Sequence, residues 1–432
     1  MSTFQTLAGF RDFYPDDCAF KNFIFERFRQ SAITFGFEEY DAPILEPMEL
    51  FMAKSGEEIV SQLFNFEDRG GRSVAMRPEM TPSLARMVGA RASTLRRPIK
   101  WFSISEMFRY ERPQRGRLRS FYQFNADIFG NRSSYADAEI ILLGIHVLKN
   151  FGLTAEDFHV RLSDRQLWTL FIRSHNMGED DIPGVLGIID KIEREEPSKT
   201  IESLDKICKG NGRKIFDDLL EIRAIRSISG IREFFKKFAN DIFAERIDEL
   251  AQLLARITAF GVSDFVTIDL NIVRGLAYYT GFVFEIFERS GQSRALAGGG
   301  RYDNLIKRLG YADLPAVGFA IGDVTLGNLL KEKNIVPKLS KNIHCFIVYS
   351  TQTEKLALQQ ATMLRGQKIN TDYCLDPTTF SKQLKMAAQV NAKYAIIFGE
   401  EEAKTGHAKV KDMLSANEIV VAIDRLVEVI SR

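Results

Sequence analysis

The segment 122–128 alternates between mostly apolar and polar side chains, and this pattern constrains the fold more than any other in the chain. The even positions carry Tyr122, Phe124, Ala126 and Ile128, and the odd positions carry Gln123, Asn125 and Asp127. Because successive side chains of a strand point to opposite faces, the pattern predicts a strand with one face on a core. The other face then offers two amides and a carboxylate, which suits the floor of a site for something small and specific.

A run of basic residues comes just before this strand, within the hairpin-like stretch Phe108–Gly130. The run contains one acid, Glu111, and the arginines Arg109, Arg112, Arg115, Arg117 and Arg119. Charges of one sign repel each other, so the run implies an anionic partner such as phosphate. Arginines for phosphate beside a polar floor are typical of a nucleotide-using enzyme.

Length and composition bound the organisation and the partners. At 432 residues we expect two or three domains, and the formal net charge of +1 limits any nucleic-acid surface to a local patch. The four cysteines have neither zinc nor redox spacing. The chain begins without the features of a signal peptide, and no apolar run is long enough to span a bilayer. We therefore expect a cytoplasmic protein with no membrane partner.

The character of the sequence changes twice along the chain. Strand-like segments up to about residue 163 resume near 262, and the intervening 164–261 has helical spacing of Ile and Leu among Lys and Glu. We predict a helical insertion there. After Pro337, short apolar runs alternate with helical patterns, which favours a small parallel-sheet α/β domain over about 340–432.

Glycines could bring backbone close to a ligand at 297–302, Ala-Gly-Gly-Gly-Arg-Tyr. This run fits either a plain turn or a backbone that supplies N–H groups to an anion or a ribose just before a helix. The chain has neither a P-loop nor a Gly-x-Gly-x-x-Gly fingerprint after a strand. Any ATP would therefore bind in another manner.

Two further segments place charge in unusual surroundings. If 76–81 is extended, Arg77, Glu79 and Thr81 share a face, either as a solvent-facing edge strand or as a receptor for a substrate ammonium. Arg274 lies in an apolar, aromatic stretch, where it pairs with Glu285 or Asp269 or meets developing phosphate charge. The five histidines form no metal-spaced cluster, so we expect no metal site built from protein ligands alone.

Taken together and in order, these segments resemble the class II aminoacyl-tRNA synthetases, in the form of the histidyl-tRNA synthetases. The hairpin resembles motif 2, and 41–46, Asp-Ala-Pro-Ile-Leu-Glu, is similar to the dimer-forming motif 1. Arg77-Pro-Glu-Met-Thr81, Arg274-Gly-Leu-Ala-Tyr-Tyr279 and Gly298-Gly-Gly-Arg-Tyr-Asp303 resemble signatures of the histidine enzyme. Segments 398–402 and 410–413 resemble its anticodon-binding domain. Several long motifs in the right order make the resemblance specific.

The resemblance implies a pocket for the amino acid histidine. Glu79, Thr81 and Gln123 hold its α-amino group in this interpretation. Asp127 and Tyr279 read its imidazole ring. The remaining lining residues implied are Tyr278 and Tyr302.

The resemblance also implies the nucleotide and tRNA contacts. Arg109 and Arg274 grip the α-phosphate of ATP and the attacking carboxylate, as the catalytic residues. Arg117 reaches the terminal phosphates. The motif 2 loop, with Arg112, Gln114 and Arg115, touches the acceptor end of the tRNA.

The implied activity is that of a histidine--tRNA ligase (EC 6.1.1.21), which uses ATP and Mg²⁺, L-histidine and tRNA(His), and works as a homodimer. The implied fold is an α+β catalytic domain with a mixed, mainly antiparallel sheet, a helical insertion and a C-terminal α/β anticodon-binding domain. We place these at 1–163 with 262–335, at 164–261 and at 340–432. The alternative is a non-catalytic paralogue, either a regulatory subunit of histidine biosynthesis or a tRNA-binding sensor.

The sequence departs from the family pattern at two positions. Motif 3 of most members carries an arginine that contacts ATP, and Thr325 stands where it would fall. Ala277 replaces an acidic residue that many members have before the tyrosine pair. The first departure leaves open how the adenine and the γ-phosphate are held.

Overall fold

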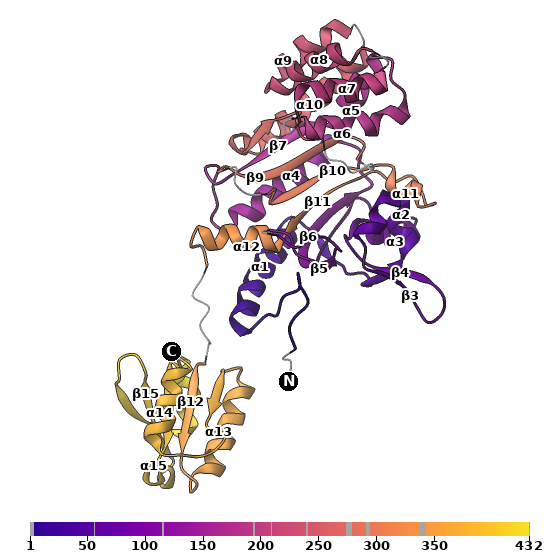
Figure 1. Ribbon diagram of the computed structural model, residues 1–432. Helices are drawn as coiled ribbons and strands as arrows, with labels where there is room; N and C mark the ends of the chain where they lie inside the picture. Colours follow the sequence, from indigo (N-terminus) through magenta and orange to yellow (C-terminus); the bar gives the residue numbers. More distant parts are fainter. Residues whose placement is uncertain are drawn as a thin grey trace. The chain divides into compact units, whose positions relative to one another are not determined.

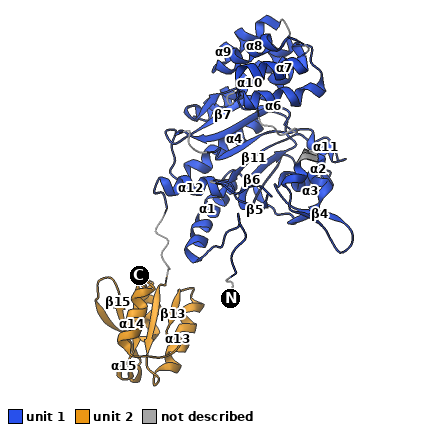
Figure 2. Ribbon diagram, viewed as in Figure 1, with its two compact units in different colours: residues 1–336 blue, residues 337–432 orange. Residues whose placement is uncertain are grey.

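The computed structural model describes residues 4–55, 57–114, 116–192, 195–208, 210–238, 241–273, 279–290, 294–336 and 343–431. The chain divides into two compact units, Met1–Val336 and Pro337–Arg432 (Figure 2). Among the described residues, no helix has both the length and the apolar character needed to cross a bilayer.

The first unit is built on an eight-stranded sheet (Figure 1). Its order is β1 (Glu38–Glu39), β5 (Ile99–Phe108), β6 (Ser120–Phe129), β11 (Ala316–Gly322), β10 (Ala297–Arg301), β9 (Phe282–Glu288), β7 (Phe158–Asp164) and β8 (Val266–Ile268). The six strands from β5 to β7 are antiparallel to their neighbours, and only the short edge strands β1 and β8 pair in parallel. The predicted mixed, mainly antiparallel sheet is confirmed.

One face of this sheet carries the core. Phe124, Ala126 and Ile128 of β6 are buried there, as their alternation predicted. The helices α1 (Pro15–Thr34), α4 (Ser134–Lys149) and α12 (Asp323–Glu332) cover this face and contact its strands. Burial of each large apolar side chain contributes about 1.5–3 kcal/mol, so this layer holds the opposite face of the sheet in a fixed shape.

A small three-stranded sheet, β2 (Leu45–Pro47), β4 (Ser73–Met76) and β3 (Asn65–Glu67), lies in the same unit with α2 (Met48–Ser55) and α3 (Thr81–Ala90). The segment 76–81 is not extended throughout, because β4 ends at Met76 and α3 begins at Thr81, so Arg77, Glu79 and Thr81 do not share the face of one strand. Pro82 at the first turn of α3 favours a helix start there, since its fixed φ suits that position.

The glycine run is part of a strand and does not form the plain turn considered from the sequence. A Cβ on Gly300 would lie 2.6 Å from the carbonyl oxygen of Phe282 on the neighbouring strand. Glycine therefore lets β10 approach β9 closely at this point. The predicted helix after it is short, α11 (Leu305–Arg308).

Between the two parts of the sheet the chain is helical, as predicted. The helices are α5 (Arg165–Ser174), α6 (Ile182–Lys191), α7 (Pro197–Cys208), α8 (Gly212–Ala224), α9 (Ile228–Phe235) and α10 (Asp241–Ala259). Asp164 joins them to the sheet: its carboxylate caps α5 by accepting from Leu167 N at 2.7 Å and pairs with Arg246 of α10. This segment belongs to the first compact unit, and its boundary as a separate domain stays a prediction.

The second unit is an α/β sheet of order β13 (Thr371–Tyr373), β12 (Cys345–Tyr349), β14 (Tyr394–Phe398), β15 (His407–Asp412) and β16 (Glu418–Ala422). Its helices are α13 (Glu354–Gly366), α14 (Phe380–Gln389), α15 (Glu400–Lys404) and α16 (Leu426–Ile430). The first three strands are parallel, as predicted, but β15 and β16 are antiparallel. A short turn with Ala416 at φ 61° joins the last two strands, and such a turn joins only antiparallel neighbours.

Asp164 provides a test of how the helical segment is anchored. The side chains of Asp164 and Arg246 are 0% and 8% exposed, so Asp164→Ala leaves a buried guanidinium without its main partner. We expect the free energy of unfolding of the first unit to fall by roughly 3–5 kcal/mol in urea titrations. Asp217→Ala is the matched control, since it removes an exposed pair with Arg213 that contributes less than about 1 kcal/mol. Equal losses in the two variants would contradict the anchoring role.

Candidate active site

The second face of the large sheet is hollow because its central strands carry small residues. Directly opposed residues of neighbouring strands share a face. Across one such row, Ala320 of β11 and Gly298 of β10 lie between Asn125 and Glu285. Across the next, Gly318 and Gly300 follow Asp127 of β6. The polar side chains of β6 therefore border a floor made mostly of backbone.

A small cavity of about 80 Å³ lies on this floor, and polar side chains line most of it. Every described residue that the sequence resemblance assigned to the amino acid is among them: Glu79, Thr81, Gln123, Asp127, Tyr279 and Tyr302. Glu79 and Thr81 reach the cavity from the turn before α3 and from its first residue. The structure thus brings together residues that are up to 223 positions apart in the sequence.

Asp127 is the buried acid of this cavity, with 4% of its surface exposed. Tyr302 donates its phenolic hydrogen to Asp127 Oδ1. A carboxylate has capacity for about four hydrogen bonds, so this acid can also accept from a ligand. Burial raises the pKa of Tyr40 well above its usual value, and the nearby charge of Asp127 raises it further. Tyr40 therefore remains a neutral, buried phenol near Asp127.

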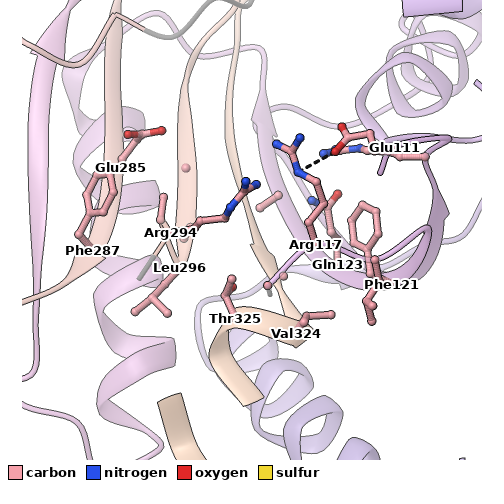
Figure 3. A pocket seen from close by; sticks show the side chains of 18 residues that line it. Glu111, Arg117, Phe121, Gln123, Glu285, Phe287, Arg294, Leu296, Val324 and Thr325 are labelled. Atoms are coloured by element: carbon pink, nitrogen blue, oxygen red, sulfur yellow. Dashed lines mark ion pairs between the residues drawn. The ribbon is translucent and has the colours of Figure 1, made fainter. Parts of the chain in front are cut away.

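A larger cavity, of about 670 Å³, shares lining residues with the small one. Figure 3 shows the side chains that line this larger cavity. Arg109, Gln123, Gly298 and Ala320 line both, so the two spaces meet there. Arg109 is held in place at this junction: its Nε donates to Pro78 O at 3.0 Å, and its guanidinium lies 5.0 Å from the Phe121 ring centre. A ligand that fills both cavities passes this guanidinium.

The rest of the large cavity is strongly charged. Its further lining includes Glu111, Arg117, Phe121, Glu285, Phe287, Arg294, Val324 and Thr325 (Figure 3). Arg117 Nε lies 2.6 Å from Glu111 Oε2. Backbone hydrogen bonds between Gln114 and Arg117, 3.0 and 2.8 Å long, close the loop that carries this arginine. Arg112 and Gln114 are exposed on that loop.

Three predicted site residues, Arg115, Arg274 and Tyr278, lie outside the described residues. Conversely, the sequence analysis gave Phe121 and Arg294 no role, although both line the large cavity. Phe121 just precedes the alternating pattern that drew attention to β6. Arg294 is a lone arginine ahead of the glycine run, and only the folded chain shows that its side chain lies near Gly116 of the motif 2 loop.

The antiparallel sheet and its two joined cavities define the class, that of a class II aminoacyl-tRNA synthetase. The family model "Histidyl-tRNA synthetase" matches residues 9–325, and "Anticodon binding domain" matches 338–432. A histidine--tRNA ligase of Opitutus terrae is 46% identical over 97% of this chain and 96% of its own length. A chloroplastic/mitochondrial one of Arabidopsis thaliana is 37% identical over 97% of this chain and 85% of its own. The chain belongs to the histidyl-tRNA synthetase family.

Solved structures show the same fold. The histidyl-tRNA synthetase of Nostoc sp. PCC 7120 superimposes with a TM-score of 0.80 at 23% identity, covering 100% of both chains. An ATP phosphoribosyltransferase regulatory subunit/histidyl-tRNA synthetase from Bacillus halodurans C has a TM-score of 0.73 at 22% identity, over 92% of this chain and 98% of its own. The fold is therefore shared by a protein described as a histidyl-tRNA synthetase and by one whose description also names a regulatory subunit.

Gly318 tests the small-residue floor. A Cβ there would collide with the Asp127 carboxylate and would lie 2.9 Å from Ala126 O. We expect Gly318→Ala to lower the free energy of unfolding by roughly 1–3 kcal/mol in calorimetry or urea titration, because backbone cannot yield as a flexible side chain can. Gly187→Ala on α6 is the control: nothing lies within 4 Å of its Cβ, so we expect unchanged or slightly higher stability. A stable Gly318→Ala protein would refute the close packing.

Proposed function

We propose that this chain activates histidine with ATP and transfers the histidyl group to the 3′ end of tRNA(His), which is histidine--tRNA ligase activity (EC 6.1.1.21). The single observation that carries the proposal is the junction of a small polar cavity with a large charged one at Arg109. Family membership supports the same reaction.

The small cavity receives histidine. Glu79, Thr81 and Gln123 hold its α-ammonium, because a carboxylate, a hydroxyl and an amide oxygen all accept hydrogen bonds. Asp127 and Tyr279 read the imidazole, which offers one donor and one acceptor when neutral. An apolar isostere leaves these buried groups unpaired, so it is rejected strongly.

Two further tyrosines complete the amino-acid pocket. Tyr302 holds Asp127 in place by donating to it. Tyr278 is assigned to the same pocket by resemblance alone. In this proposal neither tyrosine selects the substrate: selection of histidine over other amino acids depends on Asp127 and on the residues that bind the α-ammonium.

The large cavity receives ATP. The histidine carboxylate is ionised near neutral pH, so its attack on the α-phosphate needs no general base. The obstacle is the repulsion between two anions, and fixed guanidinium groups lower it by electrostatics. Arg109 sits where carboxylate and α-phosphate meet, Arg274 joins it by resemblance, and Arg117 holds the terminal phosphates. The oxygen–phosphorus bond to pyrophosphate breaks as the histidyl-adenylate forms.

Mg²⁺ can be held at this site mainly by the phosphates of bound ATP, with one protein carboxylate. No group of three or more His, Cys, Asp or Glu side chains in the described ranges is arranged to hold a metal ion, but the Glu285 carboxylate lines the large cavity. Mg²⁺ is often held by one carboxylate, substrate phosphates and water. Glu285 would hold the ion, which supplies neutralisation of phosphate charge when bound.

The tRNA meets the protein in two places. In the second step the 3′-terminal ribose hydroxyl attacks the histidyl carbonyl and releases AMP. Arg112, Gln114 and Arg115 of the motif 2 loop contact the acceptor end, and the unit 337–432 contacts the anticodon. Cations on an exposed loop suit phosphate contacts, which position a nucleic acid without reading its sequence.

Assembly and location follow from the same resemblance. We propose a homodimer through the motif 1 segment 41–46, which includes the start of β2. A cytoplasmic location stays a prediction from the sequence.

The decisive measurement is ATP–pyrophosphate exchange with each of the twenty amino acids. We expect Mg²⁺-dependent exchange with histidine at least about a hundredfold faster than with any other, because the buried acid discriminates by unpaired groups. A purified protein without histidine-dependent exchange is the non-catalytic paralogue instead. Omission of histidine from the assay is the matched control.

Asp127→Ala separates recognition of the amino acid from binding of ATP. We expect the KM for histidine to rise roughly a hundredfold, since a charged hydrogen bond in a buried site is lost, with the KM for ATP within about twofold of the parent. Tyr302→Phe should give a smaller change in the same direction, because it removes only the donor to Asp127. If both KM values rise equally, Asp127 is structural and the assignment is wrong.

A further inference from the structure

Arg294 is a cation of the large cavity that the sequence did not assign. It lies in the connection between β9 and β10 and is exposed to solvent. Within the described part of the chain Arg294 forms no ion pair within 4.0 Å of a carboxylate; its acidic neighbour Glu111 acts on it at longer range and pairs with Arg117. Structural arginines of this unit are different, since Arg77, Arg246 and Arg301 are all buried and paired with acids.

The side chain of Arg294 lies beside Thr325 and the motif 2 loop. A Cβ on Gly116 would be 3.9 Å from Arg294 Cδ and 3.6 Å from Thr325 Cγ2. Figure 3 shows the Arg294 guanidinium extending across the cavity toward Arg117, with Thr325 below it. The stem of Arg294 thus occupies the neighbourhood in which the family pattern would place an arginine at position 325.

The charges at this end of the cavity do not balance. Arg117 and Arg294 face each other, and Glu111, the nearest acid, already pairs with Arg117. Partial burial lowers the pKa of Arg294 and the positive charge of Arg117 lowers it further, whereas the negative charge of Glu111 raises it by less. The large cavity is lined by three arginines, Arg109, Arg117 and Arg294, and by two acids, Glu111 and Glu285, so an excess of positive charge favours an anion between the guanidinium groups.

We propose that Arg294 binds the terminal phosphate of ATP opposite Arg117, from the β9–β10 connection, in the subsite that Thr325 of α12 leaves without a cation. This inference rests on the proposed function. The α-phosphate belongs at Arg109, where the two cavities meet, so the remaining phosphates extend toward lining residues that the small cavity does not share. A guanidinium presents several N–H donors in a planar fork, which matches two phosphate oxygens.

The test is Arg294→Ala in the full-length protein, with exchange kinetics and direct binding as readouts. We expect the KM for ATP, and the KM for pyrophosphate in the reverse reaction, to rise roughly tenfold to a hundredfold, from the loss of charged hydrogen bonds. The KM for histidine and the affinity for AMP should stay within about twofold. An equal loss of AMP affinity would overturn the proposal, because AMP lacks the terminal phosphates.

Two further variants sharpen the result. Thr325→Arg, added to Arg294→Ala, should return the KM for ATP to within about threefold of the parent if both positions serve one subsite. A double variant no better than Arg294→Ala would overturn that shared subsite. Arg289→Ala is the matched control: Arg289 is an exposed arginine of the same connection, but it donates to the carbonyls of Ala155 and Asp264. Its kinetics should match the parent.

The outcomes also separate this inference from the proposed function. If the parent protein shows no histidine-dependent exchange, the proposed function is wrong. A parent protein with full exchange and an Arg294→Ala variant with an unchanged KM for ATP removes only the role of Arg294.

Discussion

The pairing of β6 with β11 is the constraint on which the rest of the site depends. It sets Asp127 opposite Gly318 and Asn125 opposite Ala320. A shift of register by one residue would turn the polar side chains of β6 into the core and bring Phe124 to the cavity. The apolar layer under α1, α4 and α12 prevents this shift, because burial of its side chains fixes which face is inward. Core packing on one side of the sheet therefore determines the chemistry on the other.

Arginines serve two physical roles in this unit, and their partners distinguish them. Arg301 donates to both carboxylate oxygens of Asp137 at 2.9 Å, and Arg77 pairs with Asp41 at 2.9 Å; both guanidinium groups are buried. Arg117 and Arg294 instead face an open cavity that contains fewer acids than cations. An arginine that is paired with a buried acid holds parts of the fold together. An excess of positive charge at an open cavity instead favours the binding of an anionic ligand.

The sequence predicted the parts of this site that depend on local pattern. The alternation along β6 predicted both its buried face and its polar face, and two arginines of the basic run, Arg109 and Arg117, line the large cavity. The sequence did not predict the positions that depend on packing between distant segments of the chain. Arg77 shares a short motif with Glu79 and Thr81, yet it is buried away from their cavity, since the strand ends at Met76. Arg294 could not be placed from the sequence, because the residues that it meets in the cavity, Gly116, Arg117 and Thr325, are distant along the chain. The antiparallel end of the second sheet was missed because short apolar strands look alike in either direction.

The N-terminal segment connects two walls of the large cavity, the motif 2 hairpin and α12. Arg11 Nη2 lies 2.8 Å from Asp323 Oδ2, and the other oxygen of this carboxylate accepts from Tyr122 N at 2.9 Å. Gly9 O accepts from the backbone N–H groups of Arg119 and Ser120 at 2.9 and 3.1 Å. The N-terminal segment thus bonds both to the base of the motif 2 hairpin and to the first turn of α12. A movement of the hairpin relative to α12 must lengthen these hydrogen bonds and the ion pair. The two walls are therefore expected to move as one rigid body.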